Sequence, residues 1–154
     1  MLLKCIFDNG QFDAAMKLTM YTDYAIRVMA FVAAKDPDVC SIREIADAYG
    51  ISRNHLMKVV QDLSSAGYVA AIRGRNGGIR LGRAASEINL GDLLRHTEGL
   101  KELLDCGNCP IRSGCGVPSI LREATAAFVS VFDKYFVSDI VPSGSTLRKL
   151  LFAA

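Results

Sequence analysis

Two short helical segments joined by a four-residue turn place the tightest limit on how this chain can fold. The first opens with the run Ser41-Ile-Arg-Glu44, in which the serine and glutamate can cap each other's backbone, and it stops at Gly50. The second opens at Ser52, and its apolar residues recur at helical spacing: Leu56, Val59, Val60 and Leu63. Two helices joined by Tyr49-Gly-Ile-Ser52 predict a helix-turn-helix.

A β-hairpin is predicted directly after the second helix, which closes at Gly67. Two apolar stretches, 68–72 and 79–81, flank the run Arg73-Gly-Arg-Asn-Gly-Gly78. Asn76-Gly77 is a pair that adopts the positive φ angles of a tight hairpin turn. The chain is therefore predicted to be mainly α with a small β-hairpin, which is the winged helix-turn-helix class.

Three other helices are predicted, over 22–34, 89–97 and 119–136. Thr22 can cap the first, and Asp23 in its first turn suits the helix dipole. The third is long, and a chain this short cannot easily cover its apolar stripe, so a partner subunit is expected there. That stripe consists of Leu121, Ala124, Phe128, Val131, Phe132 and Tyr135.

The predicted organisation has five parts. They are an N-terminal extension over 1–15, a DNA-binding domain over 16–98, a cysteine-containing loop over 99–118, a dimerisation helix over 119–141 and a tail over 142–154, whose last residues are expected to fray. The extension has no signal-peptide pattern, and no apolar run approaches the length of a membrane span. A cytoplasmic protein without membrane contact is predicted, in which cysteines stay reduced.

Basic residues concentrate in the helix-turn-helix and the hairpin. The net charge is only +2, yet residues 51–83 hold six Lys and Arg side chains and one acid, Asp62. This patch predicts a surface for double-stranded DNA, although a winged helix can also bind proteins. The candidate DNA contacts are Ser52, Arg53, Asn54, His55, Lys58, Arg73, Arg75, Asn76 and Arg80.

These candidates divide by the part of DNA that they would contact. Arg53, Asn54 and His55 stand at the exposed start of the second helix, which enters the major groove in such folds. Arginine can bond guanine in bidentate fashion, and asparagine does the same with adenine. Lys58 on the same helix would also face the major groove, with a phosphate contact as the alternative. The hairpin arginines would contact phosphates or enter the minor groove.

Three cysteines form a second candidate site in the turn-rich run Cys106-Gly-Asn-Cys109-Pro-Ile-Arg-Ser-Gly-Cys115. Thiolates at this spacing can converge on one metal, and three of them leave one coordination position open. A structural zinc site, a redox pair with a spare thiol and an iron–sulfur centre all remain possible from the residues. Cys5 and Cys40 lie far from this run in the sequence and are expected to be bystanders.

Three stretches resemble the Rrf2 family of bacterial regulators: Leu18 to Arg27, Tyr49 to Lys58 and the wing from Val69 to Gly82. The run Ser52-Arg-Asn-His55 is most similar to the family's nitric-oxide-sensing repressors. The resemblance covers nearly all of 16–141, and it implies a homodimer with one iron–sulfur cluster per subunit, a [4Fe-4S] more than a [2Fe-2S]. Operator binding would then depend on the state of the cluster. The resemblance also suggests Met16 as the usual start.

The cluster ligands are implied by the same resemblance. Cys106, Cys109 and Cys115 would be three of them, and an aspartate from the first helix of the partner subunit, here Asp23, would be the fourth. The chain departs from the family in a shorter gap between the first two cysteines. It also has Pro118 where the family's iron–sulfur assembly regulators have a histidine ligand.

The predicted function is a transcriptional repressor that senses nitric oxide. An iron-responsive or cluster-sensing regulator of the same family is the alternative, and a zinc-stabilised interaction protein is a further one. An enzyme is not predicted, because no general acid or base constellation stands out in the sequence.

Overall fold

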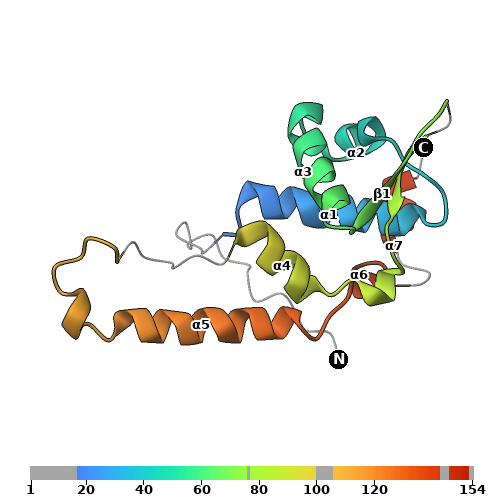
Figure 1. The fold of residues 1–154 in the computed structure, drawn as a ribbon. Helices are drawn as coiled ribbons and strands as arrows, with labels where there is room; N and C mark the ends of the chain where they lie inside the picture. The colour runs from blue at the N-terminus through green and yellow to red at the C-terminus, as the bar shows by residue number, and fades with distance from the viewer. Residues whose placement is uncertain (1–16, 76, 100–105, 143–145, 153–154) are drawn as a thin grey trace, which may run out of the picture.

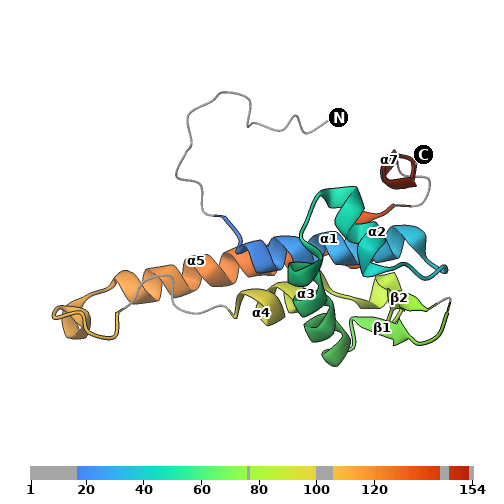
Figure 2. The ribbon, with the colours of Figure 1, turned by 90° about the horizontal axis from the view of Figure 1, so that it is seen from above.

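The computed structural model describes residues 17–75, 77–99, 106–142 and 146–152. The N-terminal half holds α1 (Met20–Lys35), α2 (Ile42–Tyr49), α3 (Arg53–Ser65), β1 (Val69–Ile72) and β2 (Gly78–Leu81). The rest holds η1 (Ala85–Glu87), α4 (Leu90–Glu98), η2 (Arg112–Gly114), α5 (Val117–Phe132), α6 (Val137–Ile140) and α7 (Thr146–Phe152). Helix α5 reaches out from the packed body and carries the cysteine loop at its far end (Figure 1, Figure 2).

The predicted helix-turn-helix is confirmed. The Ser41 hydroxyl accepts a hydrogen bond from the Glu44 amide at 3.2 Å, and the Glu44 carboxylate accepts one from the Ser41 amide at 2.7 Å. Helix α2 then ends at Gly50, whose φ of +64° is a left-handed conformation that glycine adopts without strain. The predicted apolar stripe of α3 is buried against α1 and α2: Leu56, Val59, Val60 and Leu63.

The hairpin is also confirmed, with β1 and β2 antiparallel and Val69 opposite Leu81. Within the described part of the turn, the positive φ lies at Gly74 (+119°) and not at Gly77 as predicted; Asn76 is outside the described residues. Gly77 is required for another reason. A Cβ atom there would lie 2.2 Å from the Ile72 carbonyl oxygen, so the chain needs glycine for close backbone approach.

Helix α1 begins at Met20, two residues before the predicted start. Its cap is Thr19, whose hydroxyl accepts a hydrogen bond from the Thr22 amide at 3.2 Å. The Thr22 hydroxyl is fully buried and donates to the Thr97 hydroxyl of α4 at 2.9 Å. Glu98 of α4 accepts a further bond from the Thr19 amide at 2.7 Å, so contacts distant in sequence fix this helix end.

The C-terminal part differs from the prediction in two ways. Helix α5 ends at Phe132, four residues earlier than expected, and a turn then leads into α6. Residues expected as a frayed tail include helix α7, in which the Phe152 ring packs edge-on against Phe31 of α1 at 5.2 Å between centroids. The sequence pattern of the last residues does not reveal this contact, because its partner lies in α1.

The core surrounds α1, which contacts α3, α4, α6, α7 and β2. Val28, Met29 and Val32 of this helix are fully buried. No helix among the described residues is long and apolar enough to cross a membrane. The arrangement places the DNA-binding candidates and the cysteine loop at different ends of the molecule (Figure 1).

Candidate nucleic-acid interface and metal centre

Helix α3 turns one polar side away from the core. Ser52, Arg53, Asn54 and Lys58 are all exposed, as the sequence analysis predicted. The Ser52 side chain makes no capping bond to α3, so its hydroxyl is available for a ligand. These groups lie at the start of the helix, where backbone N–H groups that lack helical partners also favour an anion.

The wing is joined to the segment before α2 by backbone pairing. The Cys40 amide donates to the Ile79 carbonyl at 2.9 Å, and the Ile79 amide donates to the Cys40 carbonyl at 2.7 Å. Gly78 permits this approach, since a Cβ atom there would lie 2.5 Å from the Cys40 carbonyl oxygen. Cys40 thus has a structural role, and burial raises the pKa of its thiol to about 11, which disfavours the reactive thiolate.

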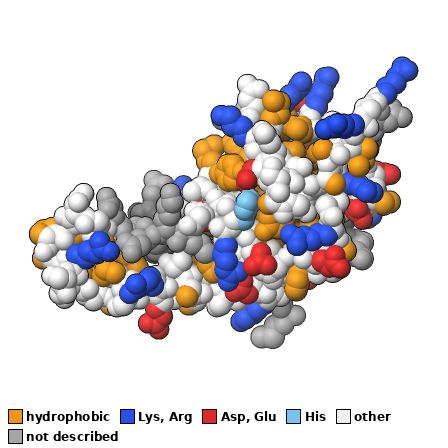
Figure 3. Space-filling model, in the orientation of Figure 1, with side chains coloured by type: hydrophobic (Ala, Val, Ile, Leu, Met, Phe, Trp, Pro, Cys, Tyr) orange, Lys and Arg blue, Asp and Glu red, His pale blue; other side chains and the backbone are white. Residues whose placement is uncertain are grey.

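Within the part of the chain that the structure describes, the candidate basic residues form no ion pair with an acidic side chain. Among the described residues, the ion pairs use Arg27, Lys35, Arg43, Arg95 and His96 as their basic members. The exposed candidates on α3 and the wing take part in none of them: Arg53, Lys58, Arg73, Arg75 and Arg80. Lys and Arg side chains gather over α3 and the wing tip along one side of the molecule (Figure 3). Uncompensated positive charge of this kind attracts a polyanion.

His55 lies at the edge of this surface. Its ring stacks near that of Tyr24 on α1, with centroids 6.3 Å apart and the planes 24° from parallel. Met57 and Gln61 of α3, which were not among the candidates predicted from the sequence, are also exposed. Met57 lies one turn and Gln61 two turns after the start of the helix. Both lie outside the apolar stripe, and this was the sequence signal that could have predicted their exposure.

Asp62, the single acid of the basic segment, connects three helices. Its carboxylate accepts a hydrogen bond from the Tyr21 hydroxyl of α1 at 2.6 Å and lies 2.8 Å from the His96 Nε2 atom of α4. Burial, together with this hydrogen bond and the nearby negative charge, raises the pKa of Tyr21 to about 12, so the phenol remains a donor. The position of α3 is therefore tied to both α1 and α4.

The cysteine loop is built from consecutive turns. The Cys109 amide donates to the Cys106 carbonyl at 3.5 Å, and the Arg112 amide donates to the Cys109 carbonyl at 3.2 Å. All three cysteines are half-buried and free of disulfides. Across the described ranges, no three His, Cys, Asp or Glu side chains form a group that could hold a metal ion. The donor set suits an iron–sulfur cluster, but the described residues of one chain do not assemble a complete site.

Asp23 lies on α1 within the packed body, away from the loop at the end of α5 (Figure 2). Its carboxylate accepts a hydrogen bond from Arg27 Nε at 2.8 Å, and both side chains are nearly half exposed. The Arg27 guanidinium also stands 5.5 Å from the ring centroid of Tyr49 at the end of α2. Asp23 therefore lies next to Arg27 and not next to the three cysteines of its own chain.

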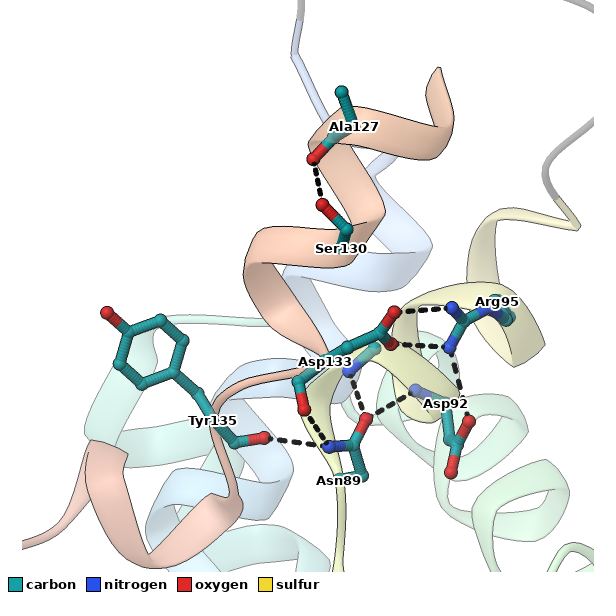
Figure 4. A network of polar contacts seen from close by, with 8 residues as sticks. Asn89, Asp92, Arg95, Ala127, Ser130, Asp133 and Tyr135 are labelled. Carbon is teal, nitrogen blue, oxygen red and sulfur yellow. Dashed lines mark hydrogen bonds and ion pairs between the residues drawn. The ribbon is translucent and has the colours of Figure 1, made fainter. Parts of the chain in front are cut away.

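A polar network fixes α4 against the end of α5 (Figure 4). Arg95 donates to both carboxylate oxygens of Asp133 at 2.7 Å, and this arginine holds the pKa of Asp133 below its usual range. The Asn89 side chain caps α4 through the amides of Gly91 and Asp92 and donates to the Asp133 carbonyl at 2.8 Å. These bonds set the angle between the two helices that flank the cysteine loop.

Comparison with known proteins supplies the family. Residues 18–143 match the Rrf2 family, which is described as iron-dependent transcriptional regulators. The chain belongs to the Rrf2 family. Two relatives are HTH-type transcriptional regulators called NsrR. The one from Bacillus licheniformis is 47% identical over 88% of this chain and 99% of its own, and the one from Bacillus subtilis is 45% identical over 88% of this chain and 97% of its own.

Solved structures show the same Rrf2 architecture. The oxidised form of CymR from Staphylococcus aureus is 26% identical and superimposes with a TM-score of 0.69, covering 85% of this chain and all of that one. IscR from T. potens has the same TM-score at 23% identity and covers 85% of this chain and 90% of its own, a likeness of fold alone. The family, the winged fold and the role as a transcriptional regulator rather than an enzyme are thereby confirmed.

Proposed function

We propose that this chain is a dimeric transcriptional repressor whose operator binding is controlled by an iron–sulfur cluster that reacts with nitric oxide. The observation that carries the DNA-binding part is the set of exposed basic residues on α3 and the wing that form no ion pair among the described residues. The sensing part is supported by 45–47% identity to the NsrR regulators along nearly their whole length. A regulator of chromosomal DNA works in the bacterial cytoplasm.

DNA binding divides between α3 and the wing. Arg53 and Asn54 read base edges in the major groove, while the Ser52 hydroxyl and Lys58 bind phosphates at its rim. Arg73, Arg75 and Arg80 bind DNA phosphates on the wing side, and Asn76, which lies outside the described residues, is a further candidate for contact with DNA. His55, at the edge of the basic surface where its ring stacks near Tyr24, contacts a phosphate.

A second copy of the chain packs against α5 to form a homodimer. The exposed side of α5 carries Val117, Ile120 and Val131, with exposed fractions of 42%, 64% and 50%, whereas Val129 on another side is 3% exposed and faces the body. An apolar helix face left open to water is typical of a subunit interface. Two α5 helices packed together would place each cysteine loop beside the other subunit.

Cys106, Cys109 and Cys115 hold the cluster, and Asp23 of the partner subunit provides the fourth ligand. A bound cluster, of the [4Fe-4S] type, would supply iron able to react with nitric oxide, and the Asp23 carboxylate would be a weaker iron ligand than the three thiolates. When Asp23 is not a ligand, its carboxylate pairs with Arg27. The guanidinium of Arg27 also lies over the ring of Tyr49, the last residue of α2 in the helix-turn-helix. Arg95 ties α4 to Asp133 at the end of α5 remote from the loop, and Asp62 of α3 contacts His96 of α4 and Tyr21 of α1.

Iron or cluster status is a second candidate signal, because the matched family is described as iron-dependent. The same ligands and DNA surface would serve it. The two candidates differ only in what removes or alters the cluster in the cell.

Anaerobic purification tests the metal site. The parent protein should be brown and contain iron, and Cys106→Ser, Cys109→Ser and Cys115→Ser should each lose iron because two thiolates are too few firm ligands. Cys40→Ser is the matched control and should retain iron, since Cys40 is buried beside the wing. Asp23→Ala should retain a cluster that is lost more readily. A colourless parent that contains zinc would overturn the proposal in favour of a zinc-stabilised protein.

A further inference from the structure

Met57 is an apolar side chain on the polar side of α3. It is 53% exposed, although the apolar residues of this helix are otherwise buried. It follows Arg53 by four residues and Asn54 by three, so it lies on the same side of the helix as both, one turn further along. Gln61 follows it by another turn. An apolar side chain is therefore exposed to water between polar groups on this side of α3.

Exposed apolar residues elsewhere in the described chain do not share this setting. Val117, Ile120 and Val131 belong to α5, where a second copy is proposed to cover them. In the segment from α2 to β2, the large apolar side chains exposed among the described residues are Met57 and Ile72, and Ile72 is on the wing at 38%. Met57 alone stands on the helix that is expected to enter the major groove.

The major groove offers one apolar group, the C5-methyl of thymine. A methionine is long, flexible and apolar, so it can cover such a methyl without needing a hydrogen-bond partner. The neighbours on α3 suit hydrogen bonding to guanine, adenine and phosphate, and none of them supplies an apolar contact.

We infer that Met57 is a specificity-determining residue that recognises a thymine methyl group in each operator half-site. Arg53 and Asn54 fix the register of α3 through polar contacts, and Met57 adds a preference at a base pair one helical turn away from them. The inference rests on the proposed function, because it requires that α3 enters the major groove.

Thymine-to-deoxyuridine replacement tests this contact, because it removes one methyl and nothing else. A high-affinity site is first selected from a random double-stranded DNA library with the parent protein. Each thymine is then replaced in turn, and binding is measured by fluorescence anisotropy for the parent and for Met57→Ala. At one thymine per half-site the parent should bind about fourfold more weakly, the loss expected from one uncovered methyl group. Met57→Ala should show no loss at that position.

Two further variants make the result decisive. Met57→Leu, also apolar, should restore most of the preference, whereas Met20→Ala, which removes a methionine that is 67% exposed on α1, should leave the deoxyuridine profile unchanged. Circular dichroism verifies that each variant is folded. Equal losses in the parent and Met57→Ala, or no loss at any thymine, would overturn the inference while leaving DNA binding intact. If the selection enriched no sequence at all, the proposed function would fail first, and the inference with it.

Discussion

The arginines of this chain fall into two groups that differ in whether an acidic side chain lies beside them. Arg27, Arg43 and Arg95 each pair with an aspartate. Arg53 and Arg75 have no such partner among the described residues, so their charge is available to phosphate or to a base edge. Composition alone did not distinguish the two groups, because both are exposed and spread along the sequence.

Single substitutions in these groups should have different consequences for DNA binding. Arg75→Ala should weaken binding to every sequence and reduce the salt dependence by about one ionic contact. Asn54→Ala should instead relax preference at one base pair, at about 1–3 kcal/mol. Binding titrations at several salt concentrations measure both effects.

Arg43→Ala is the control for these measurements. Arg43 is exposed on α2 and its Nε atom lies 3.5 Å from Asp47, so its removal takes away a charge that already has a partner. It should change binding little. If Arg75→Ala and Asn54→Ala both bound like the parent, α3 and the wing would not form the DNA surface.

At the scale of elements, the contact between α4 and the C-terminal end of α5 determines the position of the cysteine loop. Gly91 allows the close approach, since a Cβ atom there would lie 1.9 Å from an Asp133 carboxylate oxygen. Arg95 then holds that carboxylate with two bonds. The pair is exposed, so its contribution to global stability is small, and its main effect is on the angle between the helices.

The Arg95–Asp133 pair predicts a pH-dependent difference between the parent and Asp133→Asn. Because Arg95 lowers the pKa of Asp133 in the folded protein, the pair stabilises the fold above the ordinary aspartate pKa and is lost as pH falls through the lowered value. The parent should therefore melt at a higher temperature than Asp133→Asn at pH 7, and the difference should shrink as the pH falls below the ordinary aspartate pKa. Thermal unfolding followed from pH 7 to pH 3 measures this.

Asp47→Asn serves as the comparison, because Asp47 pairs with Arg43 on α2 through a longer contact and does not join two helices. Its melting temperature should differ less from that of the parent. A constant difference between the parent and Asp133→Asn at every pH would show that loss of the ion pair is not the cause.

Elements with local signals were predictable, and those fixed by distant contacts were not. The capping box at Ser41 and Glu44 set the start of α2 because both partners lie within one turn. The start of α1 was misplaced because Thr19 is held by Glu98, which lies far along the chain. Helix α7 was missed for the same reason, since Phe31 of α1 supplies its contact.

The candidate site shows the same division. The exposed start of α3 follows from its apolar stripe, so Arg53 and Asn54 were predicted; the exposure of Met57 follows from the same stripe but was not drawn from it, because methionine is apolar. The three cysteines were evident from spacing. Their union with Asp23 came from family resemblance and not from physical reasoning, and it stays a prediction, because the two parts lie apart within one chain (Figure 2).

For the whole molecule, the proposed dimer is argued from the open side of α5. Val131→Glu would place a charge on a residue that is 50% exposed in one chain and buried in the proposed pair. It should produce folded monomers that bind a two-half-site operator far more weakly than the parent. Light scattering together with DNA titration measures both changes.

Ser130→Glu is the matched control, since Ser130 is exposed on α5 and lies outside the apolar stripe. It should remain a dimer. If Val131→Glu were also a dimer in solution, a different surface would join the subunits.

Control of DNA binding by the cluster is the central claim, and one titration tests it most directly. Anaerobic parent protein bound to a fluorescent operator is titrated with nitric oxide, while visible absorbance and anisotropy are recorded on the same sample. The account predicts that the iron–sulfur absorbance and the operator complex change together, and that Cys40→Ser behaves like the parent. Loss of the cluster spectrum with operator binding unchanged would contradict it.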